Sequence, residues 1–203
     1  MLGQPPLSLR VDFGRMPASN EALDPGRLSF RPLTEADVPG LWAWFDAPHA
    51  RRWFARERTP ASIVEEFMGY LAGSEPIHNY IVTYAGREIG LVQWTRLGDF
   101  PLQLNGYEVG DPDVVNVDIL IGDAAHVRRG LGAPLVRRFL DEIVFAADPR
   151  FETCVIDPER ENTAAIRAYA KAGFTFVRTV IDPEDGKTPL YLMELRRQTS
   201  PGS

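Results

Sequence analysis

The sequence predicts a mixed α/β domain built on a single central, mostly antiparallel sheet with helices on both faces. Short apolar segments that alternate at period two indicate strands, and capped segments with helical spacing fall between them. The chain has 203 residues, 44% of them hydrophobic, which is enough for one buried core and marginal for two. We therefore expect one domain over residues 27–198, an N-terminal extension at 1–26 and a C-terminal tail at 199–203.

Turn and cap residues set the expected order of the elements. Residues 7–13 form an edge strand or an ordered arm, or else belong to a loose tail, and residues 98–113 are expected to form a polar, acidic loop. Caps and helical spacing predict helices that start at Thr34 (with Asp37 three positions on), at Thr59-Pro60, at Leu131 and at Asn162. Alternation predicts strands at 28–33, 79–84, 88–95, 114–122, 152–156, 174–180 and 189–195.

Composition narrows the class of partner. A net charge of −6 and a pI of about 5.1 argue against nucleic acid, because its binders usually carry basic patches. An acidic surface suits a cationic small molecule through electrostatic steering, or serves only solubility. Cys154, the one cysteine, lies in an apolar strand segment and is expected to be buried. No segment has the roughly 18 apolar residues that cross a membrane, so we expect a soluble, cytoplasmic protein.

A glycine-bearing turn after the strand at 114–122 is the most informative segment for function. It reads Val127-Arg128-Arg129-Gly130-Leu131-Gly132-Ala133 and leads into a helix. Glycines let a backbone approach an anion closely, and the first amides of a helix donate to it, aided by the helix dipole. The turn predicts a pyrophosphate site, with a simple helix start as the alternative. It lacks the third glycine of a Rossmann fingerprint and the Gly-Lys-Ser/Thr of a P-loop.

The turn resembles the coenzyme A pyrophosphate loop of the GNAT acetyltransferases, whose motif is Gln/Arg-x-x-Gly-x-Gly/Ala. Val127 stands at the first motif position, a departure that removes one polar side chain. The segment from Asn162 to Phe174 resembles a second GNAT motif, Asn-x-x-Ala-x-x-x-Tyr-x-x-x-Gly-Phe. The resemblance covers roughly residues 28–196 and implies the GNAT acyltransferase fold, with acetyl-CoA as cosubstrate and no metal. It implies that the coenzyme binds Ile119, Leu120, Ile121, Val127, Arg128, Arg129, Gly130, Leu131, Gly132, Ala133 and Asn162.

For the reaction, the resemblance implies that backbone amides at residues 118–120, where this strand parts from its neighbour, hold the acetyl carbonyl. Tyr169 matches the family's general acid, with a core tyrosine as the alternative. Asn162 either contacts the pantetheine arm or caps its helix. Asp118 lies among apolar residues of a central strand. It orients the amine or accepts its proton, unless alternation places it on an exposed face.

The nearest subfamily resemblance is to the aminoglycoside 6′-N-acetyltransferases, which confer antibiotic resistance. The run from His49 to Phe54 resembles their His-x-x-x-Trp-Trp run, and the run from Gly90 to Trp94 resembles their Gly-x-x-Gln segment. Asp118 and Asp157 fall where that subfamily places its substrate-site aspartates. The resemblance and the acidic loop predict a polycationic amine that binds Trp53, Phe54, Gln93, Glu108, Asp118 and Asp157. Trp53 and Phe54 form a floor for a sugar ring, or cap the core.

We therefore expect acetyl transfer from acetyl-CoA to the 6′-amine of an aminoglycoside. The same clues fit a siderophore-type lysine or hydroxylysine N-acyltransferase, for which a long apolar acyl pocket would be diagnostic. A polyamine acetyltransferase is a third option. A non-catalytic acyl-CoA-binding module is a fourth, and tight coenzyme A binding without turnover would indicate it. The protein is expected to act as a monomer or homodimer, without a nucleic-acid or membrane partner.

Overall fold

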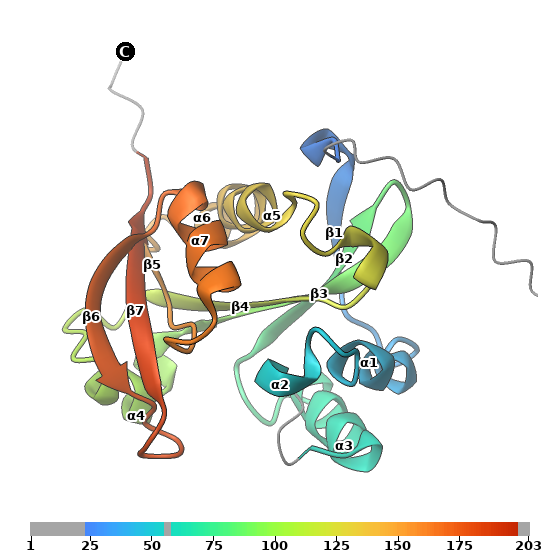
Figure 1. Cartoon of the computed structure of the whole chain (residues 1–203). Coiled ribbons are helices and arrows are strands. Elements are labelled where there is room, and N and C mark those ends of the chain that lie inside the picture. Colours follow the sequence, from blue (N-terminus) through green and yellow to red (C-terminus); the bar gives the residue numbers. More distant parts are fainter. Residues whose placement is uncertain (1–22, 55–57, 199–203) are drawn as a thin grey trace, which may run out of the picture.

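The computed structural model describes residues 23–54 and 58–198, and within them seven strands form one mixed sheet (Figure 1). The strands are β1 (Leu28–Pro32), β2 (His78–Tyr84), β3 (Arg87–Arg96), β4 (Val115–Ile121), β5 (Thr153–Ile156), β6 (Thr175–Ile181) and β7 (Pro189–Arg196). Their order is β1-β2-β3-β4-β5-β7-β6, and every neighbouring pair is antiparallel except β4 and β5. The single, mostly antiparallel sheet is therefore confirmed, whereas residues 7–13 lie outside the described part.

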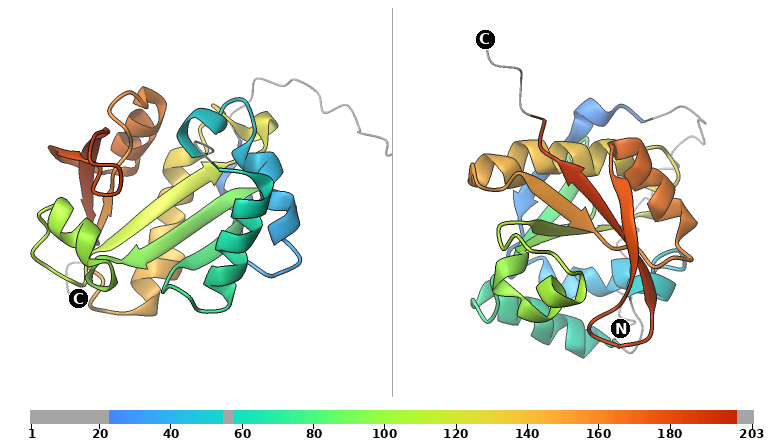
Figure 2. Two further views of the ribbon diagram at one scale, coloured as in Figure 1. Left: turned by 90° about the horizontal axis from the view of Figure 1, so that it is seen from below. Right: turned by 90° about the vertical axis from the view of Figure 1, so that its left-hand side faces the viewer.

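Helices cover both faces of this sheet, as expected (Figure 1, Figure 2). They are α1 (Val38–Phe45), α2 (Arg51–Phe54), α3 (Pro60–Leu71), α4 (Pro101–Gly106), α5 (Gly132–Phe139), α6 (Phe145–Ala147) and α7 (Thr163–Ala172). Helices α5, α6 and α7 lie on one face, while α1, α3 and α4 lie on the other. No helix in the described part of the chain is both long and apolar enough to span a membrane.

The first helix starts later than the sequence pattern predicts. Thr34 does not cap it; instead, the carboxylate of Asp37 accepts hydrogen bonds from the backbone N–H and the hydroxyl of Thr34, both at 2.8 Å, and α1 begins at Val38. Pro39 explains the difference, because proline has no N–H and is tolerated only in the first helical turn. A helix capped by Thr34 would place Pro39 in its second turn.

The sequence pattern also misses the two short helices α2 and α4. The segment 98–113, expected as an acidic loop, contains α4, which has Pro101 in its first turn and is followed by the buried Tyr107. With six residues, α4 is too short for helical periodicity to be recognised. The helix expected to start at Leu131 differs as well, since α5 is followed by a π-helical turn at Leu140–Val144 before α6.

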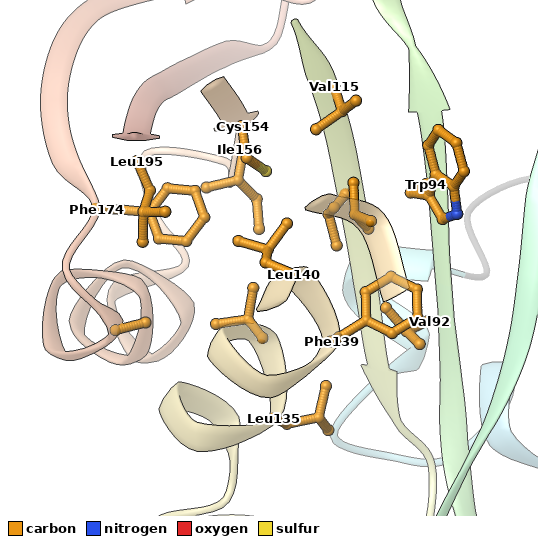
Figure 3. Packing of buried hydrophobic residues seen from close by; sticks show 14 of the residues in the cluster. Val92, Trp94, Val115, Leu135, Phe139, Leu140, Cys154, Ile156, Phe174 and Leu195 are labelled. Carbon is orange, nitrogen blue, oxygen red and sulfur yellow. The ribbon is translucent and has the colours of Figure 1, made fainter. Parts of the chain in front are cut away.

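The main core lies between α5 and the sheet (Figure 3). Phe139 and Leu140 pack there with Val92 of β3 and Val115 of β4. Cys154 of β5 is fully buried in the same cluster, as expected, and burial raises the pKa of its thiol. A second apolar cluster joins α1 and α3 to the opposite face of β2, β3 and β4. The sheet is thus anchored on both faces, which gives its polar side chains a rigid support.

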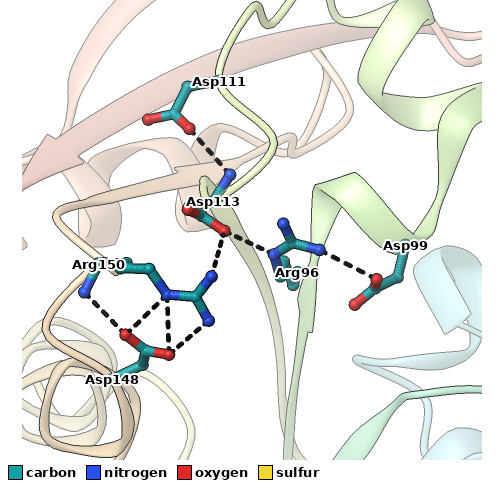
Figure 4. Close-up of polar contacts among 6 residues, drawn as sticks. All are labelled: Arg96, Asp99, Asp111, Asp113, Asp148 and Arg150. Carbon is teal, nitrogen blue, oxygen red and sulfur yellow. Dashed lines mark hydrogen bonds and ion pairs between the residues drawn. The ribbon is translucent and has the colours of Figure 1, made fainter.

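A network of ion pairs ties the long connection between β3 and β4 to the rest of the fold (Figure 4). Arg96, at the end of β3, pairs with Asp113 (Nε–Oδ1, 2.7 Å) and with Asp99 (Nη1–Oδ1, 3.1 Å). Arg150, just before β5, pairs with Asp148 at 2.7 Å and approaches Asp113 at 3.7 Å. These contacts fix both ends of the connection that carries α4.

Candidate active site

The two parallel strands of the sheet part soon after they meet. Strands β4 and β5 pair only at Val115 with Cys154 and at Asn116 with Val155. If that register continued, Asp118 would stand opposite Asp157, two residues further along each strand. The strands diverge there instead, so β4 from residue 117 onwards has no strand partner on this side among the described residues. We call this opening the β4–β5 parting.

Every second residue of β4 directs its backbone N–H and carbonyl groups into this parting, and the hydrogen bonds at the end of the strand show which residues these are. Gly122 donates its N–H to the carbonyl of Ile89 on the β3 side at 2.9 Å, and His49 Nε2 donates to the carbonyl of Ile121 at 2.8 Å. Successive residues of a strand direct their backbone groups to alternate sides. The N–H of Ile119 is therefore directed away from β3 and into the parting. Such a donor, held by a rigid sheet, suits the oxyanion of an acyl-transfer step.

The glycine-bearing turn has the backbone geometry of an anion loop. Arg128 and Gly130 have positive φ angles of 58° and 83°, and α5 starts at Gly132. Leu131, at the N-cap of α5, makes no capping hydrogen bond through its side chain. Among the described residues, the N–H groups of Gly132 and Ala133 have no hydrogen-bond acceptor, so they are available to an anion, and the helix dipole favours negative charge there.

Contacts on both sides hold this turn in place. A Cβ on Gly132 would lie 3.3 Å from the Cβ of Ala168, so α7 crosses the start of α5 closely. Before the turn, Asp123 accepts from His126 Nδ1 at 3.1 Å and from Arg87 Nε at 3.0 Å. Among the remaining residues expected to bind the coenzyme, Leu120 and Leu131 are buried in the core, Val127, Arg129 and Ala133 are half-buried, and Arg128 is exposed.

Asp118 lies on the sheet face that carries α1, α3 and α4. Gln93, its neighbour across β3 and β4, donates Nε2 to Asp118 Oδ2 at 3.3 Å. Solvent reaches the side chain, so strand alternation does expose it. Protein nevertheless surrounds the carboxyl on its other sides, and this partial desolvation, with the negative charge of Asp157, raises the pKa of Asp118 to about 7. A carboxylate with that pKa suits a general base near neutral pH.

Asp157 follows β5 directly and is half-buried. Tyr107 donates its hydroxyl to Asp157 Oδ2 at 2.6 Å, and Asn116 donates Nδ2 to Asp157 Oδ1 at 3.0 Å. Burial raises the pKa of Asp157, while these two hydrogen bonds act in the opposite direction. Burial also raises the pKa of Tyr107, and the nearby Asp157 charge adds to that shift. Asp118 and Asp157 together form what we call the carboxylate pair.

Tyr169 approaches the carboxylate pair from α7, on the other side of the parting. It is half-buried, and its ring lies 5.9 Å from that of Phe174. Burial raises the pKa of Tyr169, and the charges of Asp118 and Asp157 add to the shift. Tyr169 therefore stays protonated and can donate a proton to a leaving group. Asn162 caps α7, because its Oδ1 accepts from the N–H of Ala165 at 3.2 Å.

Three further residues expected to bind the substrate make contacts other than with the carboxylate pair. Phe54 packs edge-on against Phe45, with ring centroids 6.2 Å apart, and belongs to the second apolar cluster. Trp53 is half-buried, with the guanidinium of Arg52 4.6 Å from its ring centroid. Glu108 is exposed and forms an ion pair with Arg178 of β6. Glu108 and Arg178 line a surface hollow, and neither Asp118 nor Asp157 is among the residues that line it.

Sequence reasoning did not select several residues that act on the carboxylate pair. Tyr107 and Asn116 contact Asp157 directly. Only Asn116 had a sequence signal, as a polar residue in an otherwise apolar strand. The others come from loops that the fold brings to the site. Arg58 before α3 favours the ionised form of Asp118, whereas Glu184 between β6 and β7 opposes it, and Asp182 opposes ionisation of Asp157.

A parted sheet, a helix start with available backbone N–H groups, a titratable carboxylate and a protonated tyrosine are together the features expected of an acyltransferase. Comparison with known proteins identifies the family. A model of the acetyltransferase (GNAT) domain matches residues 34–181. The chain therefore belongs to the GNAT acetyltransferase family.

Three relatives illustrate the range of similar proteins. An aminoglycoside N(6′)-acetyltransferase type 1 from Klebsiella pneumoniae is 32% identical over 176 residues, which cover 84% of each chain. The crystal structure of aminoglycoside acetyltransferase AAC(6′)-Ib with coenzyme A and kanamycin superposes with a TM-score of 0.72 at 32% identity, covering 84% of this chain and 95% of that one. A lysine N-acyltransferase, MbtK, from a Mycobacterium species is 28% identical over 153 residues, covering 70% of this chain and 57% of the relative.

Proposed function

We propose that this enzyme transfers the acetyl group of acetyl-CoA to the 6′-amine of an aminoglycoside. The observation that carries the proposal is the carboxylate pair beside the β4–β5 parting, close to a tyrosine on α7. Likeness to aminoglycoside N(6′)-acetyltransferases over 84% of the chain supports the choice of amine. The cytoplasm is the proposed compartment, which agrees with a single, free and buried cysteine.

The residues proposed to bind the coenzyme contact different parts of acetyl-CoA. The N–H groups of Gly132 and Ala133 would hold its pyrophosphate, and the positive φ of Gly130 lets the backbone curve around the anion. The N–H of Ile119 would donate a hydrogen bond to the acetyl carbonyl oxygen. Positioning the thioester and the amine together supplies on the order of 7–11 kcal/mol of the barrier reduction.

Asp118 and Tyr169 carry the two proton transfers. The Asp118 carboxylate takes a proton from the substrate ammonium, and the neutral amine attacks the thioester carbonyl. The N–H of Ile119 stabilises the resulting oxyanion. As the carbon–sulfur bond breaks, the Tyr169 hydroxyl gives its proton to the leaving thiolate. The attacking nitrogen, which is positively charged after the attack, releases its second proton to solvent, and Tyr169 recovers a proton from solvent. Protonating the thiolate prevents it from returning to the carbonyl.

The surrounding charges favour a polycationic acceptor. The charges of Asp157 and Glu184 raise the pKa of Asp118, and the charge of Asp182 raises the pKa of Asp157, whereas Arg58 acts on Asp118 in the opposite direction. Aminoglycosides carry several ammonium groups, so a second ammonium can pair with the carboxylate that is not accepting a proton. A neutral or anionic acceptor would leave these charges repelling one another.

A thiol-release assay tests the proposal. The enzyme with acetyl-CoA and kanamycin should release free thiol and yield a product acetylated at the 6′ position, identified by mass spectrometry and NMR. Paromomycin, which has a hydroxyl at the 6′ position, serves as the matched control and should not be acetylated there. No release with any 6′-amino compound would reject the proposal.

The likeness to a lysine N-acyltransferase supports one alternative, an acyl transfer to lysine derivatives. The same assay separates the two functions if it includes lysine, hydroxylysine and spermidine, each with acetyl-CoA and with a long-chain acyl-CoA. Preference for a lysine derivative and a long acyl chain would favour the alternative. Preference for kanamycin and acetyl-CoA would favour the aminoglycoside.

A further inference from the structure

The two carboxylates of the pair are held very differently. Each oxygen of Asp157 has its own donor, the Tyr107 hydroxyl at 2.6 Å on Oδ2 and the Asn116 amide at 3.0 Å on Oδ1. Within the described part of the chain, Asp118 has one side-chain donor, Gln93, at the longer distance of 3.3 Å. Hydrogen bonds to a charged carboxylate are among the strongest in proteins, and two of them fix its orientation.

The elements that supply the two donors are themselves rigid. Tyr107 is buried, with 5% of its surface exposed, in a cluster that joins the end of α4 to β5 and β7. Asn116 lies on β4 at the last residue that pairs with β5. A Cβ on Gly106 would overlap Pro183, so α4 is packed tightly against the connection between β6 and β7. The donors therefore cannot drift from Asp157 without disturbing the sheet.

We propose that Tyr107 and Asn116 are positioning residues that hold Asp157 as a fixed anionic anchor for one substrate ammonium, so that Asp118 alone exchanges the proton of the reacting amine. This assignment rests on the proposed function. It gives two chemically identical side chains different roles: Asp157 binds an ammonium group, and Asp118 accepts a proton. The anchor selects acceptors that carry a second ammonium beside the reacting one, as polyamines and amino sugars do.

The division follows from electrostatics at short range. Two like charges in one site cannot ionise independently, so the first proton to leave comes from the carboxyl with more donors. Asp157 loses its proton first, and its charge then raises the pKa of Asp118. Among the described residues, the titratable and charged groups that interact electrostatically with the pair are Arg58 before α3, Tyr107 after α4, Cys154 on β5, Tyr169 on α7, and Asp182 and Glu184 between β6 and β7.

A substrate-free measurement tests the assignment. Aspartate carboxyl groups of the full-length enzyme are labelled with ¹³C and titrated by NMR, with signals assigned from Asp118→Asn and Asp157→Asn. In the wild type, Asp157 should lose its proton at lower pH than Asp118. Tyr107→Phe and Asn116→Ala should each move the Asp157 midpoint upward by about one pH unit, the effect expected for losing one hydrogen bond to a charge.

Kinetics add a second readout. Each variant should lower kcat/KM for kanamycin roughly tenfold, mainly through KM for kanamycin, with KM for acetyl-CoA unchanged. The acid limb of the kcat/KM profile should move to higher pH, because activity requires both carboxylates to be ionised. A merely structural role would lower kcat/KM equally at every pH. Tyr191→Phe is the matched control: it removes a tyrosine hydroxyl from β7, does not touch Asp157, and should change none of these values.

The outcomes separate this assignment from the proposed function. An Asp157 midpoint that stays in place in both variants, or that moves equally in Tyr191→Phe, would overturn the anchor role even if kanamycin is acetylated. Wild-type enzyme that shows the expected midpoints yet acetylates no aminoglycoside would overturn the proposed function and leave the anchor standing. Thermal unfolding of each variant verifies that it is folded before either result is read.

Discussion

Replacing Asp118 with asparagine should nearly abolish acetyl transfer while making the folded protein more stable above pH 7. The change keeps the size of the side chain and its contact with Gln93, but it removes the group that accepts the ammonium proton. General bases contribute about a hundredfold to ten-thousandfold to rate, so kcat for kanamycin should fall by an amount in that range. KM for acetyl-CoA should be unchanged, because Asp118 does not contact the anion loop.

The magnitude of the pH effect follows from the raised pKa of Asp118. With a pKa of about 7, the carboxylate is the minor form in mild acid, so kcat/KM of the wild type should be roughly thirtyfold lower at about pH 5.5 than on its plateau. Profiles of kcat/KM report the free enzyme. A bound ammonium lowers the pKa of Asp118, so the acid limb of kcat should lie at lower pH than that of kcat/KM.

The stability of the folded protein changes with pH in the opposite direction to its activity. The pKa of Asp118 is higher in the folded protein than its ordinary value of 3.8, so between about pH 4 and pH 7 the folded state binds more protons than the unfolded state. The free energy of unfolding therefore falls as pH rises through this window. The Asp118→Asn variant has no carboxyl group to ionise at this position, so its free energy of unfolding does not decrease for this reason. The Tm of the variant should therefore exceed that of the wild type by an amount that grows from about pH 5 to about pH 8.

Two assays check these statements, thiol release over a pH series and thermal unfolding over the same series. An Asp118→Asn enzyme that keeps more than about a tenth of wild-type kcat would refute the base assignment, since that loss is too small for a general base. A wild-type kcat/KM that stays flat down to about pH 5 would refute the raised pKa.

Three further predictions concern the coenzyme side of the site. Tyr169→Phe should lower kcat by roughly a hundredfold, with KM for both substrates little changed, because it removes only the proton donor for the thiolate; equal KM and kcat losses would contradict this. Gly130→Val should destabilise the fold by about 1–2 kcal/mol and raise KM for acetyl-CoA but not for kanamycin, because its φ of 83° is unfavourable for a β-branched residue; titration calorimetry with coenzyme A measures the lost affinity. Asn162→Ala should cost about 1 kcal/mol through loss of the α7 cap, measured by urea unfolding, while Asn162→Asp should retain most of that stability.

The sequence by itself determined the elements whose signals are local. The strand at 114–122, the glycine turn after it and the capped helix from Asn162 each depend on neighbouring residues, and two motifs in that order indicate the family. Pro60 and the Thr59 cap likewise mark α3, which starts where the pattern predicts. The start of α1 was misplaced because the Thr34 and Asp37 pattern resembles a cap, although Pro39 forbids a helix there. That error could have been avoided from the sequence alone.

Only the tertiary structure decided how the acidic side chains combine. Asp118 and Asp157 lie 39 positions apart in the sequence and come together because β4 and β5 are parallel neighbours in register before they part. Tyr107 reaches Asp157 from a loop whose place depends on ion pairs at both of its ends. In the same fold, Glu108 pairs with Arg178 of β6, and Phe54 packs against Phe45 in the second apolar cluster. Strand pairing and loop packing join residues that are distant along the chain, and no local pattern of residue types encodes which of them will meet.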